Sequence, residues 1–573
     1  MGALMGWMGK GDASPAVVSR IRQSGGALSY RVPRGYAMSG VMLSADRHAA
    51  GIGGPMELHR HDVIMLFDGR LDNLVALRQE LACPVGEDIR GVLLAGWARY
   101  RTGLFARLQG PFALAIYDET ARSWTCARDQ YGQRPLYYAS DPATFIFASD
   151  VRTLQTWPHL KNRIDLDKLA YVFSLGCAPP EFGLHMGISR LLPGHVLTVG
   201  SDLEVHVAPW PGQERDPEGT DMPPPAHGTT DKTLTRLLGN AVVAGTGHAS
   251  ALLMGTSATG RKADKALDLL RHLGSYAPKL HPVQMSVDQD DASIIERLRA
   301  LQRIAGEPLV ALLPDHAAFV PQYSDETVLV SPAGGAELLG VAPHYDLFLR
   351  DVVRLREEGR PPVWWKTSFY DVMPFIRDLF QHSHGGLTES ERMTVIGPAM
   401  THTLLFASPD ALGPELEDVE TAGLRRAAAE LDMRTSLPGR ELLVLDSVAA
   451  LDGREAVAPF LASPVVRHCR ASSQYDGSPA RGGGVSSRLR ELVERLARNY
   501  MHDTLTSTTC RKRGLFSTAQ VERHLRATPH RSARSIRILW TMFCTELWFQ
   551  DTIDVRPVFR QDIPDISIVA GHA

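Results

Sequence analysis

The sequence predicts two successive domains, an α+β domain followed by an α/β domain that ends in helices. Short β-like runs follow one another closely before residue 209, and strand and helix patterns alternate after residue 228. Closely spaced strands are typical of antiparallel sheets, whereas βαβα alternation indicates a parallel sheet. Between the two regions, residues 209–228 are rich in Pro, Gly and charged residues. We therefore predict a linker there, between domains over 1–208 and 229–573.

The first region contains five apolar runs of strand length and two segments with helical spacing. Asp, Gly and Pro separate the runs, as expected for turns. We expect strands over residues 63–67, 112–117, 123–127, 136–138 and 145–148, and helices over 71–81 and 89–101.

The second region begins with alternating strands and helices. We expect strands over 251–254, 283–287 and 327–330, and helices over 263–272 and 292–304. Beyond Tyr345 the pattern is mainly helical.

Composition excludes several classes of protein. The formal net charge of −3 gives no reason to expect nucleic acid or a membrane surface as a partner. The six cysteines are far apart and none forms a CxxC pair, which argues against a zinc site and a disulfide framework. No apolar run reaches the length of a membrane span, and the first residues lack a signal-peptide pattern. These features predict a cytoplasmic protein.

The strand predicted over 251–254 leads into a turn of small residues before a helix. Free backbone N–H groups and the helix dipole both favour a phosphate at such a turn. The turn contains Gly255, Thr256, Ser257 and Thr259. An ordinary connection between a strand and a helix has the same pattern, so both interpretations stay open.

Several motifs, in order along the chain, resemble the glutamine-dependent asparagine synthetase family. Phe67-Asp68-Gly69-Arg70-Leu71 and Ala127-Arg128-Asp129-Gln130-Tyr131-Gly132 are similar to its glutamine-domain signatures. Similar segments continue to Trp548. The resemblance implies an α+β N-terminal-nucleophile, glutaminase-type sandwich, followed by an α/β ATP-pyrophosphatase (adenine nucleotide alpha hydrolase-like) synthetase domain with a helix-rich C-terminal part.

In that family the first domain hydrolyses glutamine with a cysteine placed directly after the initiator methionine. Here that residue is Gly2. The family's Asn-Gly oxyanion element appears as Asp68-Gly69, and a carboxylate there would repel a developing oxyanion. We therefore expect no glutaminase activity from this domain and interpret it as a structural support.

The second domain of the family adenylates a carboxylate with ATP, after which an amine displaces AMP. The resemblance implies nucleotide-binding residues at the ends of two strands: Leu253, Met254, Gly255, Thr256, Ser257, Thr259, Gly334 and Gly335. Ala258 and Ala336 stand where the family has its two acidic Mg²⁺ ligands. ATP is thus the expected cofactor, both usual carboxylates for Mg²⁺ are missing, and no residue is assigned as a metal ligand.

Two residues are candidates for catalysis by the same resemblance. Lys512 stands where the family has a lysine thought to stabilise acyl transfer, and Glu455 opens a Glu-x-Arg-x-Pro-Phe-Leu signature in which Val457 replaces the arginine.

Three functions remain open. The first is ATP-dependent formation of an amide or lactam, as in the β-lactam synthetases and lasso-peptide cyclases, which lack the N-terminal cysteine. Its substrate would be a small carboxylate or a precursor peptide. The second is a non-catalytic homologue that keeps the fold and binds a nucleotide, a peptide or a catalytically competent homologue. A homologous or maturation-enzyme partner is expected in either case. The third is asparagine synthesis from aspartate. A homodimer is expected from the family.

Overall fold

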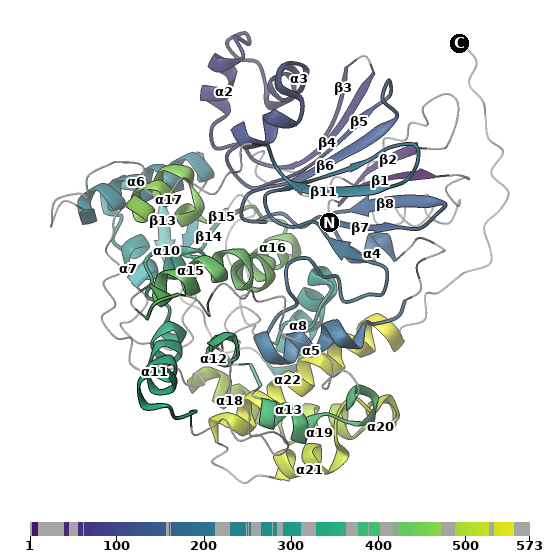
Figure 1. Ribbon diagram of the computed structural model, residues 1–573, viewed down its shortest axis with the longest axis vertical. Helices are drawn as coiled ribbons and strands as arrows, with labels where there is room; N and C mark the ends of the chain where they lie inside the picture. Colours follow the sequence, from purple (N-terminus) through teal and green to yellow (C-terminus); the bar gives the residue numbers. More distant parts are fainter. Residues whose placement is uncertain are drawn as a thin grey trace.

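A computed structural model of the chain is shown in Figure 1. The structure describes the following residues: 3–9, 39–44, 56–60, 62–155, 157, 160, 162–211, 230–247, 249, 251–253, 265–277, 279–282, 290–310, 328–362, 376–384, 386–387, 389–401, 416, 419–421, 423–471, 487–526 and 532–554.

Two antiparallel sheets form the N-terminal part. One has the strand order β2-β1-β8-β7-β9, and the other has the order β11-β10-β6-β5-β4-β3. The strands of the first sheet are β1 (Ala3–Gly9), β2 (Ser39–Ser44), β7 (Tyr137–Ser140), β8 (Thr144–Ala148) and β9 (Ser189–Arg190). Those of the second are β3 (Met56–Arg60), β4 (Val63–Gly69), β5 (Phe112–Asp118), β6 (Ser123–Arg128), β10 (His195–Val199) and β11 (Val205–Pro209).

The two sheets pack face to face, and helices cover their outer faces. Along β4, Ile64 and Leu66 belong to the core that also contains Leu4 and Phe147 of the other sheet. Met65 belongs instead to the core that contains residues of helices α2 (Leu74–Glu80) and α3 (Ile89–Tyr100). Successive side chains of a strand point to opposite faces, so β4 contributes to both cores. The predicted antiparallel sheet with helices packed on it is thereby confirmed, as two sheets.

A four-stranded parallel sheet begins the C-terminal part. Its strand order is β13-β12-β14-β15, with β12 (Ala251–Leu253), β13 (Leu280–Pro282), β14 (Val328–Val330) and β15 (Ala456–Val457). Helices α6 (Thr230–Thr246), α7 (Lys265–Arg271) and α8 (Asp291–Ala305) come from the same part of the chain. Strand β13 lies just before the predicted run 283–287, which falls outside the described residues.

The described part of the chain after β14 is mainly α-helical, and turns, short 3₁₀ and π segments and β15 connect the helices. The α-helices are α10 (Gly335–Leu338), α11 (Pro343–Glu358), α12 (Ile376–Ser383), α13 (Glu389–Val395), α15 (Leu424–Arg434), α16 (Leu442–Leu451), α17 (Ser463–Ala471), α18 (Ser487–Leu496), α19 (Tyr500–Thr506), α20 (Thr508–Arg513), α21 (Thr518–Arg526) and α22 (Ala533–Phe549). Among the described helices, none is long and apolar enough to cross a membrane.

The helical part also takes in a helix from the first 208 residues. Helix α5 (Leu166–Leu175), in the lower half of Figure 1, packs against α12 and α13. The ring centroids of Phe173 and Phe516 are 6.0 Å apart, and Arg392 donates a hydrogen bond to Ser174. Trp210, within the predicted linker, stacks on Phe112 of β5. Residues 212–228 of that linker lie outside the described residues.

His185 makes the fold sensitive to acid. Its ring is 1% exposed and lies 5.7 Å from the ring of Trp548, and burial lowers its pKa to about 4. The folded protein therefore favours the neutral ring, whereas the unfolded chain takes up a proton near pH 6.5. The neutral His185 ring contributes its full stabilisation above pH 6.5. As the pH falls to about 4, the free energy of unfolding should decrease by about 3 kcal/mol.

Urea unfolding at several pH values between 7.5 and 4 checks this expectation. His185→Gln should flatten the pH dependence by that amount, and His206→Gln, which changes an exposed ring, should leave it unchanged. Equal pH dependence in the wild type and His185→Gln would contradict the assignment.

Candidate functional site

The carboxyl ends of β12 and β14 lie next to each other. The two strands are parallel, and Leu253 is paired with Val330 at their last residues. The predicted phosphate turn follows Leu253 in the sequence, and the Gly334-Gly335 turn follows Val330. Ligands of open α/β sheets bind at the carboxyl ends of the strands. The two segments predicted to bind nucleotide therefore begin at one edge of the sheet.

Tight packing explains the two glycines after β14. Gly334 has a φ of +83°, and a Cβ atom there would lie 2.4 Å from the Leu461 side chain. A Cβ atom on Gly335 would lie 2.6 Å from that of Ala266 in α7. The glycines thus let α10 approach α7 and the segment after β15 closely, and this packing is needed whether or not a nucleotide binds.

Most of the predicted phosphate turn lies outside the described residues. This holds for Met254, Gly255, Thr256, Ser257 and Thr259, and for Ala258. Leu253, Gly334 and Gly335 are described, and Leu253 is buried. The assignment of these residues to nucleotide binding stays a prediction.

The position of the second family Mg²⁺ ligand has no ligand atom. Ala336 is the second residue of α10, and the neighbouring Glu337 is buried. Burial raises the pKa of the Glu337 carboxyl well above its ordinary range, and the charges of Glu441 and Asp432 raise it further. A carboxyl that favours its neutral form is a poor Mg²⁺ ligand. The described residues of this turn therefore do not fit the family's metal.

The predicted catalytic residue Glu455 lies at the contact with the N-terminal part. Its carboxylate pairs with the guanidinium of Arg134, and Arg134 Nη1 also lies 2.8 Å from Asp446 Oδ1. Burial acts to lower the pKa of Arg134, but Glu455, Asp68 and Asp446 outweigh it and raise the pKa. Both arms of the guanidinium fork are thus held by carboxylates from the C-terminal part.

Lys512 is exposed on α20. Figure 1 places α20 at the lower edge of the helical part, apart from β14 and β15. The described structure therefore does not bring Lys512 together with Gly334, Gly335 or Glu455, and its catalytic role stays a prediction.

Asp68 and Gly69 end strand β4. Asp68 is 2% exposed and is close enough to Arg134 to raise that residue's pKa. A buried carboxylate at this position provides a negative charge where the family's oxyanion element would donate hydrogen bonds. Gly2 lies outside the described residues.

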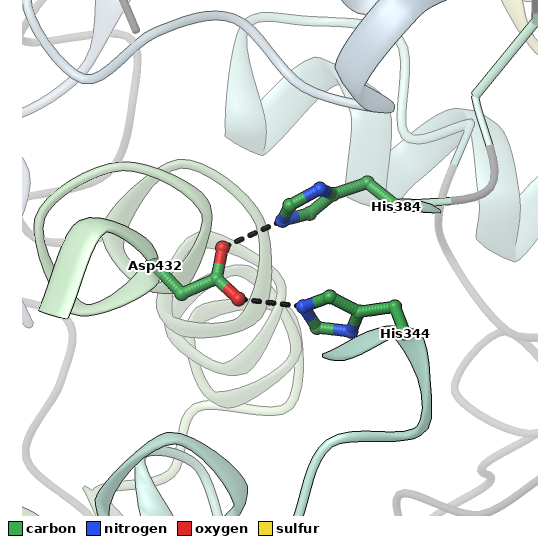
Figure 2. A group of neighbouring side chains, drawn as sticks. All are labelled: His344, His384 and Asp432. Atoms are coloured by element: carbon green, nitrogen blue, oxygen red, sulfur yellow. Dashed lines mark hydrogen bonds and ion pairs between the residues drawn. The ribbon is translucent and has the colours of Figure 1, made fainter. Parts of the chain in front are cut away.

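Sequence reasoning missed one cluster of buried polar side chains. Figure 2 shows the rings of His344 and His384 next to each other, each directed at a different oxygen of the Asp432 carboxylate. His344 Nε2 lies 2.6 Å from Asp432 Oδ2, and His384 Nε2 lies 2.6 Å from Asp432 Oδ1. No sequence signal marks the cluster, since 48 residues separate His384 from Asp432 and 88 separate His344 from it.

The pKa values of His344 and Asp432 are both lowered in this cluster. Burial lowers the pKa of His344 to about 4. Burial would raise the pKa of Asp432, but the two histidines outweigh it and hold that pKa well below its ordinary range. At neutral pH the Asp432 carboxyl is therefore ionised.

Known proteins match the N-terminal part of the chain. Residues 34–210 match the glutamine amidotransferase domain family. The chain is 31% identical to asparagine synthetase (glutamine-hydrolyzing) 3 of Bacillus subtilis, over 24% of this chain and 23% of that protein. It is 31% identical to a putative asparagine synthetase (glutamine-hydrolyzing) of Mycobacterium tuberculosis H37Rv, over 24% of this chain and 22% of that protein. These matches support the asparagine synthetase superfamily as the chain's relatives.

The matched region spans about a quarter of the length of these relatives. Among solved structures, a glutamine phosphoribosylpyrophosphate amidotransferase from B. subtilis, complexed with ADP and GMP, is similar at 12% identity with a TM-score of 0.25. That similarity covers 62% of this chain and 79% of the other. A TM-score this low carries no argument about the fold.

Proposed function

We propose that this chain is an asparagine synthetase-like protein that forms an amide bond through an acyl-adenylate and does not hydrolyse glutamine. One observation supports the proposal above all. The two segments predicted to bind ATP follow the paired residues Leu253 and Val330, at one edge of a parallel sheet. An anion at this edge would meet backbone N–H groups of the turns.

The reaction has two steps. In the first, a substrate carboxylate oxygen attacks the α-phosphorus of ATP, and pyrophosphate leaves. In the second, an amine attacks the acyl carbon and loses a proton, and AMP leaves with the electrons of the broken C–O bond. We assign Lys512 to stabilising the charge that develops in this second step. We assign Glu455, the first residue of the family signature, to supporting the same step. Because Ala336 offers no ligand, we propose that neither step depends on Mg²⁺ held at this turn.

The substrate is a small carboxylate or a precursor peptide, whose own amine could close a macrolactam ring as in the lasso-peptide cyclases. Such ring closure needs no ammonia. This agrees with the buried carboxylate of Asp68 at the position of the glutaminase oxyanion element. We also propose that the chain forms a homodimer and acts beside a homologous or maturation-enzyme partner.

The test is carboxylate-dependent exchange of labelled pyrophosphate into ATP, with Mg²⁺ and a set of candidate acids that includes aspartate and precursor peptides. Exchange with one of these acids supports the proposal, and exchange with aspartate alone identifies asparagine synthesis. Lys512→Met should keep the exchange and lose at least tenfold in amide formation, which corresponds to about 1.4 kcal/mol. Lys232→Met, which changes an exposed lysine of α6, is the matched control.

A second candidate function rests on Ala336 and Glu455. The first offers no metal ligand, and the second is engaged by Arg134. Both fit a non-catalytic homologue that keeps the fold and supports a competent partner. Absence of exchange with every acid, together with no heat of ATP binding in calorimetry, would favour this function and overturn the first.

A further inference from the structure

Three helical segments converge on the cluster of His344, His384 and Asp432. His344 is the second residue of α11, His384 directly follows α12, and Asp432 lies in the last turn of α15. The side chains of His344, His384 and Asp432 are 14%, 1% and 0% exposed. Their ligand atoms all lie within 4.8 Å of one another. Figure 2 shows both imidazoles directed at the same carboxylate.

The hydrogen bonds of His384 indicate that a positively charged species lies between its ring and Asp432. Its Nδ1 lies 2.9 Å from the backbone carbonyl oxygen of Phe380, which can only accept. Nδ1 therefore carries the proton of the neutral ring, and Nε2 presents a lone pair. That lone pair would face Asp432 Oδ1, another acceptor, at 2.6 Å. Either a second proton or a metal ion must lie between these two atoms.

The remaining contacts of the cluster fit a metal ligand set. A metal-bound histidine characteristically donates its other N–H group to a carbonyl or carboxylate, as His384 does to Phe380. The Ser436 hydroxyl donates to Asp432 Oδ1 at 2.6 Å, which fixes the orientation of the carboxylate. The aromatic rings of Tyr345 and Phe380 pack edge-on against the two imidazoles and hold them in place.

We propose that His344, His384 and Asp432 bind one divalent transition-metal ion of the Zn²⁺ class. Two imidazole nitrogens and one carboxylate suit zinc and other first-row metals better than Mg²⁺ or Ca²⁺, which prefer oxygen ligands. Bonds of about 2.0–2.1 Å in a tetrahedral arrangement place ligand atoms about 3.3 Å apart. The present contacts of 2.6 Å would then widen by about 0.7 Å, and ligand atoms up to 4.8 Å apart would approach by up to about 1.5 Å. This is the size of a side-chain adjustment.

The burial of the three side chains favours a structural role for the ion, whose fourth tetrahedral position is left to a water molecule. No ligand of the cluster is exposed enough to present the metal to a substrate, and the three residues belong to three different helical segments. The metal would tie α11, the end of α12 and α15 together. None of the three ligands is a residue predicted to bind nucleotide, so the test of this site does not depend on the proposed activity.

Metal analysis of the full-length, tag-free protein is the experiment. After dialysis against Zn²⁺ and removal of free metal, we expect inductively coupled plasma mass spectrometry to find about one zinc ion per chain. His384→Gln and His344→Gln should each bring the content close to zero. His382→Gln is the matched control, because it changes a half-buried histidine of α12, close in sequence to His384, that is not a member of the cluster. Ser436→Ala should weaken binding roughly 10–100-fold.

A measurement on the wild type keeps the proposal falsifiable if these variants fail to fold. Co²⁺ added to the metal-free wild type should give the visible absorption bands of a tetrahedral site with nitrogen and oxygen ligands, saturating at one equivalent. Absence of these bands, together with no zinc retained by the folded wild type, would overturn the proposal. His384 would then be a doubly protonated imidazolium paired with Asp432.

Discussion

Replacing Arg134 by methionine should lower the free energy of unfolding by about 3–5 kcal/mol, the cost of breaking a buried ion pair by removing one partner. The side chains of Arg134, Asp446 and Glu455 are 3%, 6% and 4% exposed. Without the guanidinium, two carboxylates would stay buried with no counter-charge from this residue. Burial of an unpaired charge is among the largest penalties that a single substitution can introduce.

Urea unfolding at pH 7 measures this loss. Arg152→Met, which changes an exposed arginine of α4 (Val151–Leu154), should change stability by less than about 0.5 kcal/mol. In the triple variant Arg134→Met, Asp446→Leu, Glu455→Met, most of the loss should be recovered, because the two carboxylates that pair with Arg134 are removed together with it. A loss below about 1 kcal/mol for Arg134→Met would show that the carboxylates find other partners.

The same residues bear on the proposed chemistry. Glu455 is a predicted catalytic residue, yet the described structure directs its carboxylate to Arg134. A loss of activity in Glu455→Gln would therefore count toward catalysis only after the stability of the variant is measured. Arg134→Lys, which keeps the charge but loses the bidentate fork, separates the two effects.

The strands of the N-terminal part could be predicted where both faces are covered. The apolar run of β4 reads as a strand because one face meets the other sheet and the other face meets helices. Strand β1 was not predicted, since Gly6 and Gly9 interrupt its apolar pattern. The structure explains Gly6, because a Cβ atom there would lie 2.4 Å from the Phe147 ring. Close packing of a neighbour, which no single sequence displays, decides such positions.

Local motifs located the strand ends of the candidate site but not its long-range contacts. Leu253 and Gly334 could be found because a strand followed by a turn of small residues is a local pattern. Arg134 and Asp446 are 312 residues apart, and no spacing rule connects them. The same holds for His384 and Asp432, which only the packing of α12 against its neighbours brings together. Clusters of this kind depend on tertiary structure.

A substitution at Gly69 can show whether the glycine of the Asp68-Gly69 motif is required by packing. It pairs with Phe112 at the end of β4 and has a φ of +146°, a conformation that side-chain-bearing residues rarely adopt. A Cβ atom there would lie 2.1 Å from the carbonyl oxygen of Pro111 and 2.7 Å from the Cα of Phe112. Both atoms belong to the backbone, so neither can move aside without displacing β5.

Gly69→Ala should therefore lower the free energy of unfolding by about 2–6 kcal/mol, as about 1–3 from backbone strain and about 1–3 from the clash. Gly86→Ala is the matched control, since Gly86 has a φ of +93° and a Cβ atom there would meet no other atom within 4 Å. Gly86→Ala introduces the backbone strain without the clash. The difference between the two variants in the free energy of unfolding, measured by chemical unfolding, is therefore the cost of the clash with Pro111 and Phe112. Equal losses would show that β5 accommodates the methyl group. A larger loss for Gly69→Ala would explain the glycine by packing alone, so that its presence gives no support to an oxyanion site.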